Sequence, residues 1–121
     1  MNRGEFEALV VEAMNSLPLE FQDRLDNVDV VVETRPTPAQ LARVGLPAGS
    51  LLFGLYEGIP LTRRTSRYGL VLPDKITIFQ EPIEAHCHTP AAIRSQVQRT
   101  VVHEIAHHFG IGDRRLREIG W

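Results

Sequence analysis

This 121-residue chain contains, near its C-terminal end, the segment His103-Glu104-Ile105-Ala106-His107. Its two histidines and its glutamate have a spacing that is typical of metal ligands and a catalytic base. On an α-helix, residues four apart lie one above the other, so both imidazoles can reach one metal ion. Glu104 sits beside them, where a carboxylate can hold a metal-bound water without being a ligand itself. The spacing therefore predicts a metal site that acts on water.

A third ligand is available past the end of the same helix. Gly110 is well placed to end the helix in the left-handed conformation that glycine adopts easily. The turn can swing Asp113, six residues past His107, back toward the two histidines. Three protein ligands leave a fourth position open, as in catalytic sites. The alternative is an exposed helix whose histidines are only polar surface residues.

The helix that carries these residues is predicted to run from Thr89, as its cap, to about Phe109. Pro90 suits the first helical position of such a helix. One face is an apolar stripe expected to pack on a sheet: Ile93, Val97, Val101 and Ile105. The opposite face is polar and is expected to line a cleft: Gln96, Arg99, Thr100, His103 and His107.

The other elements follow from hydrophobic periodicity and turn signals. Helices are expected at 5–16, 19–25, 38–43 (with Thr37 as its cap) and 113–119. Strands are expected at 28–33, 51–57 and 76–80, and a polar loop at 58–73. This order predicts a single α+β domain over residues 1–121. A small mixed sheet packs on helices, and the motif lies on the longest helix.

Composition excludes several classes of protein. Hydrophobic residues make up 43% of the chain and charged residues 23%, with a net charge of −2. These values exclude a disordered tail and a strongly basic nucleic-acid binder. No apolar stretch is long enough to span a bilayer, so no membrane partner is expected. The single Cys87 and the lack of an apolar signal segment predict a cytoplasmic protein.

The chain resembles a known family in four segments. The segment 100–113 is similar to the extended zinc motif of the small, single-domain zincin-like metallopeptidases of bacteria. Segments 25–28, 55–61 and 72–77 also resemble that family. The motif spacing is similar to that of metzincins as well, but no methionine follows the motif here.

The resemblance implies a zincin-like fold and a Zn²⁺ ion held by His103, His107 and Asp113, with Glu104 as general base. Such an enzyme hydrolyses peptide bonds of a peptide or protein substrate. Glu104 would take a proton from the attacking water and return it to the leaving amine. An oxyanion stabiliser is also needed, and four residues remain open for this role: Tyr56, Tyr68, Arg99 and His108.

A zinc-binding scaffold or partner-binding module of the same fold is the alternative function, with little or no proteolysis. Larger zincins build a specificity pocket from a C-terminal subdomain, whereas eight residues follow Asp113 here. We therefore expect a short substrate, or a partner or second copy that completes the cleft; the oligomeric state stays open. A metal-free interaction domain fits the ligand set poorly. Glu104 separates the first two functions, because a hydrolase needs it and a scaffold does not.

Three further features have weaker interpretations. Adjacent ligands cannot surround a metal in good geometry, so His86-Cys87-His88 is expected to be a loop with two solvated histidines. His108 points about 100° away from His107 around the helix and is expected to pack. The strand at 51–57 can pair with an extended peptide, as an edge strand does in zincins, or be an ordinary buried strand.

Overall fold

A computed structural model describes most of the chain, namely residues 1–23, 25, 27–58, 74–111 and 113–118. Of Asp113, Leu116 and Arg117 it describes the backbone alone. The predicted loop therefore lies, apart from Gly58, outside the described residues. The elements are α1 (Arg3–Asn15), α2 (Leu19–Gln22), β1 (Val28–Glu33), α3 (Pro38–Arg43), β2 (Gly54–Glu57), β3 (Asp74–Phe79), α4 (Gln80–His86), α5 (Pro90–His108) and α6 (Asp113–Glu118). No described helix is both long and apolar enough to cross a membrane.

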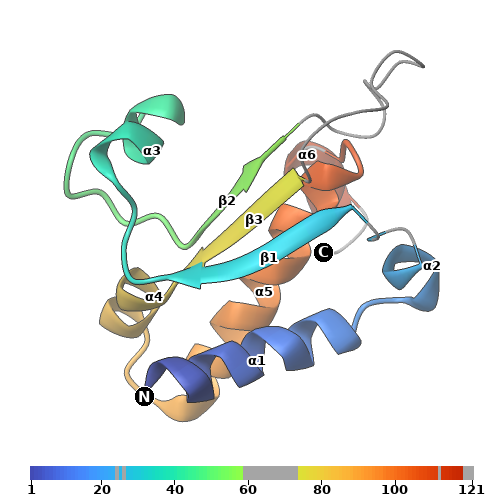
Figure 1. The fold of residues 1–121 in the computed structure, drawn as a ribbon, viewed down its shortest axis with the longest axis horizontal. Helices are drawn as coiled ribbons and strands as arrows, with labels where there is room; N and C mark the ends of the chain where they lie inside the picture. The colour runs from blue at the N-terminus through green and yellow to red at the C-terminus, as the bar shows by residue number, and fades with distance from the viewer. Residues whose placement is uncertain (24, 26, 59–73, 112, 119–121) are drawn as a thin grey trace.

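The sheet is small and mixed, in the order β1-β3-β2 (Figure 1). β1 runs parallel to β3, whereas β2 runs antiparallel to it. In this register Gly54 and Tyr56 lie opposite Ile78 and Ile76, so the four residues share one face. Within the described residues β2 pairs on one side alone, as an edge strand does. The α+β class and the small mixed sheet predicted from the sequence are confirmed.

Helices α1 and α5 cover the face of the sheet that carries Ile76 and Ile78 (Figure 1). The predicted apolar stripe of α5 is confirmed, since its four residues are all buried: Ile93, Val97, Val101 and Ile105. Phe6 and Val10 of α1 pack into the same core. Because this stripe faces the core, it fixes the rotation of α5 about its own axis. That rotation in turn decides where the side chains of His103 and His107 point.

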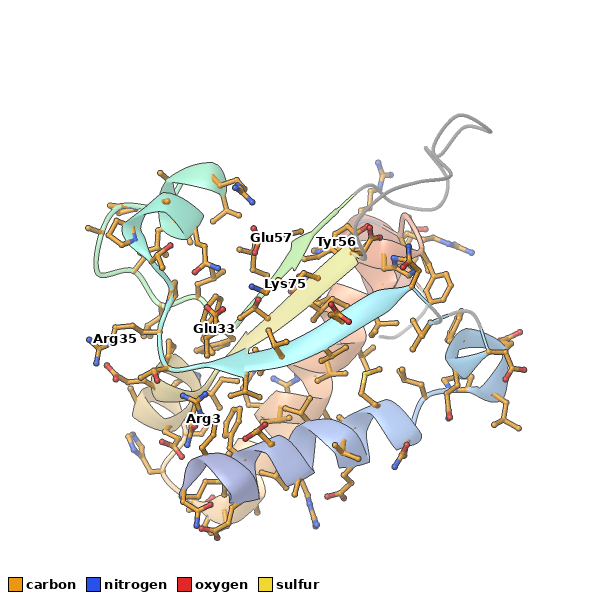
Figure 2. All side chains as sticks on the ribbon, in the orientation of Figure 1. Arg3, Glu33, Arg35, Tyr56, Glu57 and Lys75 are labelled. Atoms are coloured by element: carbon orange, nitrogen blue, oxygen red, sulfur yellow. The ribbon has the colours of Figure 1, made fainter. Side chains whose placement is uncertain are left out.

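The other face of the sheet carries charged side chains. Lys75 Nζ lies 3.4 Å from Glu33 Oε1, and Arg43 of α3 pairs with Glu57 of β2. Figure 2 shows Glu33, Lys75 and Glu57 on the side of the sheet away from α1. The two faces therefore differ in chemistry, which determines the face that the long helix covers.

The ends of α5 follow from local signals. Thr89 Oγ1 accepts a hydrogen bond from Ala92 N at 3.1 Å, and Pro90 occupies the first turn. Gly110 has a φ of 76°, the left-handed conformation expected of a residue that ends a helix. Both predicted ends of this helix are confirmed, and the left-handed turn leads directly toward α6.

The largest differences from the predictions concern three elements, while α1 and β3 each begin two residues earlier than predicted. α2 and β2 are shorter than the ranges 19–25 and 51–57, and α4 was not predicted. α4 is too short to show helical periodicity, and it buries Pro82 and Ile83 directly after β3. His86 therefore ends a helix instead of lying in a loop. Both His86 and His88 are exposed, as predicted for solvated histidines.

Candidate metal centre

The second half of α5 brings His103, Glu104 and His107 together. One potential ligand atom from each residue lies within 4.8 Å of the other two. The two imidazole rings have centroids 4.7 Å apart and are inclined at 70°. Two imidazoles beside a carboxylate are donors that suit zinc, so the residues present fit the metal that the sequence predicts. Asp113 begins α6, but its side chain lies outside the described part of the chain.

The three side chains differ in their contact with solvent. The Glu104 side chain is 9% exposed, whereas that of His107 is 33% exposed. Glu104 Oε1 lies 3.3 Å from His107 Nδ1, so the carboxylate also contacts the imidazole. A small ion or a water molecule can therefore reach His107 from solvent. The Glu104 carboxylate, in contrast, is largely enclosed by the protein.

Gly54 explains why Glu104 is buried. A Cβ atom at this position would lie 2.7 Å from Thr100 Cγ2 and 3.0 Å from Glu104 Cγ. Only glycine lets β2 approach α5 this closely without displacing one of these side chains. Thr100 was predicted on a polar cleft face, but β2 covers it and it is 5% exposed. Its hydroxyl accepts a hydrogen bond from Gln96 Nε2 at 3.0 Å.

We expect Gly54→Ala to destabilise the protein by about 1–3 kcal/mol, because the added methyl group overpacks the contact with Thr100 and Glu104. The free energy of unfolding from urea titration measures this. Gly4→Ala in α1 is the control, since the nearest other atom to its added Cβ is 3.5 Å away. A helical alanine there should be neutral or stabilising. Equal stability of Gly54→Ala and the wild type would contradict the close approach.

A hollow of about 240 Å³ lies beside the three clustered residues, between the segment 52–54 and α5. Four of the five residues predicted on the polar face of the helix line it: Gln96, Arg99, Thr100 and His103. Glu104 lines it as well. The hollow therefore borders both the carboxylate and one of the imidazoles.

A buried polar network that was not predicted from the sequence lies next to the candidate metal centre. Asp74 Oδ2 lies 2.8 Å from His108 Nδ1 and accepts a hydrogen bond from Tyr56 Oη at 2.6 Å. Asp74 and His108 are each 1% exposed. The same oxygen of Asp74 therefore faces both the tyrosine hydroxyl and the imidazole. The network ties the last turn of α5, which carries His107, to strands β2 and β3.

His108 is buried and packs as predicted, edge-on against the rings of Tyr56 and Phe109, and it also contacts a carboxylate that was not predicted. A Cβ on Gly58 would overlap the Asp74 carboxylate, so the chain also passes very close to this group after β2. The sequence contains only a weak indication of this buried carboxylate, namely that Asp74 lies just before a predicted strand rich in β-branched residues. Of the four oxyanion candidates, Arg99 lines the hollow, and Tyr68 lies outside the described residues.

The fold, with a His-Glu-His cluster on its long helix, agrees with a comparison of the sequence with known protein families. Residues 25–121 match the family model described as zincin-like metallopeptidase, and the chain belongs to this family. The resemblance found in the sequence is thus confirmed. The chain therefore has a metallopeptidase-like scaffold with a potential metal site of two histidines and a glutamate.

Among solved structures, the chain is similar to a conserved hypothetical protein from Thermus thermophilus. The TM-score is 0.59 at 23% sequence identity, over 90% of this chain and 94% of that one. At this identity the similarity concerns the fold. A comparison with curated proteins gives no match.

Proposed function

We propose that this protein is a zinc-dependent metallopeptidase. The observation that carries the proposal is the convergence of His103, Glu104 and His107 within 4.8 Å, beside a hollow open to solvent. Membership of the zincin-like metallopeptidase family supports the same activity. A scaffold without catalysis needs no carboxylate next to the imidazoles, whereas a hydrolase needs one as a base.

The residues have separate roles in the proposed reaction. His103, His107 and Asp113 would hold the zinc ion. Zinc, when bound, supplies a Lewis acid that makes water acidic enough to react near neutral pH. Glu104 would accept a proton from the attacking water and pass it to the leaving amine. Burial holds the Glu104 carboxylate in place, so it needs little reorganisation during the reaction.

We further propose that the substrate is an extended peptide or protein segment alongside β2. In the part of the chain that the structure describes, this strand is an edge, and Gly54 brings it against Thr100 and Glu104. An edge strand offers free main-chain donors and acceptors to an extended peptide. A peptide paired there would lie at the hollow that Glu104 lines. A partner chain or second copy that completes the cleft is compatible with this arrangement.

The first test is metal content. We expect the purified protein to bind about one zinc ion per chain, because a catalytic zinc site uses three protein ligands and an open position. His103→Ala and His107→Ala should each lose most of this zinc, and Asp113→Ala should bind zinc more weakly. Elemental analysis after zinc reconstitution and dialysis measures the stoichiometry.

His88→Ala is a matched control for these variants. His88 is exposed and lies outside the cluster of potential ligands. This variant should therefore keep the zinc content of the wild type. Absence of zinc in the reconstituted wild type would refute the metal site. Full zinc content in His103→Ala would show that His103 is not a zinc ligand.

A further inference from the structure

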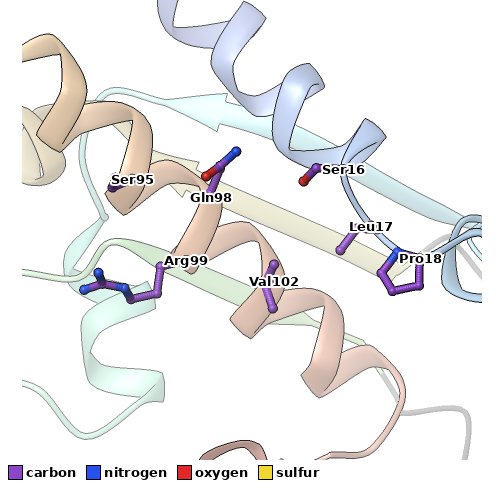
Figure 3. A pocket seen from close by; sticks show the side chains of 7 residues that line it. All are labelled: Ser16, Leu17, Pro18, Ser95, Gln98, Arg99 and Val102. Atoms are coloured by element: carbon purple, nitrogen blue, oxygen red, sulfur yellow. The ribbon is translucent and has the colours of Figure 1, made fainter. Parts of the chain in front are cut away.

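A second, larger groove lies next to the candidate metal centre, on the other side of α5 from β2. It has a volume of about 620 Å³. Its walls come from α5 and from the segment that joins α1 to α2 (Figure 3): Ser16, Leu17, Pro18, Ser95, Gln98, Arg99 and Val102. Leu17, Pro18 and Val102 make part of the wall apolar, and none of these seven described residues carries a carboxylate.

Arg99 belongs to both hollows. It lines the groove beside Leu17 and also the smaller hollow beside His103 and Glu104. Figure 3 shows its guanidinium pointing away from the segment that carries Leu17 and Pro18. Arg99 therefore belongs to the part of α5 that the two hollows share.

The guanidinium of Arg99 is also unlike the other described cations. Each of the others has a hydrogen-bonding or ionic partner: Arg3, Arg35, Arg43, Lys75, Arg94, Arg114 and Arg115. Arg99 is exposed and makes no hydrogen bond or ion pair with the described side chains. An exposed arginine is common, but this one lines two hollows, and the described lining of the larger one holds no other charged residue. The smaller hollow also holds Glu104, which does not pair with Arg99, so the guanidinium is available to an anion from outside the protein.

From this arrangement we infer that Arg99 binds a carboxylate of the peptide substrate, close to the bond that is cleaved. The inference rests on the proposed function, because it concerns the substrate of the same site. Arg99 lies one helical turn before His103, a rise of about 6 Å. An extended peptide advances about 3.3 Å per residue, so the carboxylate lies within about two residues of the scissile bond.

The apolar wall of the groove favours an apolar residue in the substrate next to the one that carries the carboxylate. Leu17, Pro18 and Val102 line it beside Arg99, so an apolar side chain of the substrate can be buried there next to the acidic one. The carboxylate can come from an Asp or Glu side chain or from a free C-terminus. Both sources present the same group to the fork of the guanidinium.

The test measures binding separately from cleavage. The zinc-loaded full chain with Glu104→Gln, which should not cleave, is titrated with two hexapeptides, Ala-Ala-Glu-Leu-Ala-Ala and its Gln twin, both blocked at their ends. Nuclear magnetic resonance reports the affinity. We expect the Glu peptide to bind about three- to tenfold more tightly at low salt, the range of an exposed to partly buried ion pair. A third peptide, the Gln twin with a free C-terminus, distinguishes a terminal carboxylate from a side chain.

Variants of Arg99 and a control locate the effect. Arg99→Gln should remove the preference for the carboxylate, and Arg99→Glu should reverse it. Both variants should unfold at the temperature of their parent, because Arg99 is exposed. Arg94→Gln, on the same helix, is the control and should keep the preference, since Arg94 pairs with Glu12 instead.

The result that overturns the inference is equal binding of the carboxylate and neutral peptides, no binding of either, or a preference that survives in Arg99→Gln. Failure of the proposed function looks different. In that case the wild type cleaves no peptide, while the preference for a carboxylate and its dependence on Arg99 are still present.

Discussion

Glu104→Gln should abolish most peptide hydrolysis while leaving the zinc content unchanged. The substitution keeps the size of the side chain and most of its hydrogen bonding but removes the group that accepts a proton. A positioned general base contributes about two to four orders of magnitude to a rate, so kcat should fall by that amount. His103 and His107 are untouched, so zinc should remain bound. Single-turnover hydrolysis and elemental analysis on the same sample measure the two quantities.

A variant of a different carboxylate is the control for the loss of a negative charge as such. Glu81→Gln removes an exposed carboxylate that pairs with Arg35, away from the cluster, and should keep full activity. If Glu104→Gln retained both zinc and the wild-type rate, the proposed role of Glu104 would be wrong. If the wild type bound zinc but hydrolysed nothing, the scaffold function would take the place of the peptidase.

Asp74→Ala should be the most destabilising substitution among the polar residues around the site. Asp74 is 1% exposed, accepts a hydrogen bond from Tyr56 and contacts His108. Removing one partner of a buried pair leaves the other without its counterpart, which typically costs about 3–5 kcal/mol. We therefore expect a loss of about 3 kcal/mol in the free energy of unfolding, measured by urea titration. Zinc affinity should fall with it, because the last turn of α5 loses its tie to the sheet.

Two further variants isolate the cause of this loss. Tyr56→Phe removes a single hydrogen bond to the same carboxylate and should cost about 1 kcal/mol. Asp29→Ala removes an exposed carboxylate from β1 and should change stability by less than about 0.5 kcal/mol. A stability of Asp74→Ala close to that of Asp29→Ala would show that the network contributes little to folding.

Much of the candidate metal centre could be predicted because the sequence signals for it are local. The spacing of His103 and His107 places both on one side of any α-helix, and no tertiary contact is needed for that. The helix itself follows from Thr89, Pro90 and Gly110, whose effects act within one turn. The apolar stripe then decides which side faces the sheet. These are short-range properties, so the sequence alone was sufficient to predict them.

The surroundings of the centre depended on tertiary structure. His108 and Asp74 are 34 residues apart, and Gly54 meets Thr100 from a different strand. Periodicity shows that Thr100 and His108 lie on particular sides of a helix, but not what covers those sides. The antiparallel register of β2 against β3 decides this, since it brings Tyr56 and Asp74 to the same face. Strand pairing is a long-range property, so the burial of Glu104 and the network behind it could be found only in the folded chain.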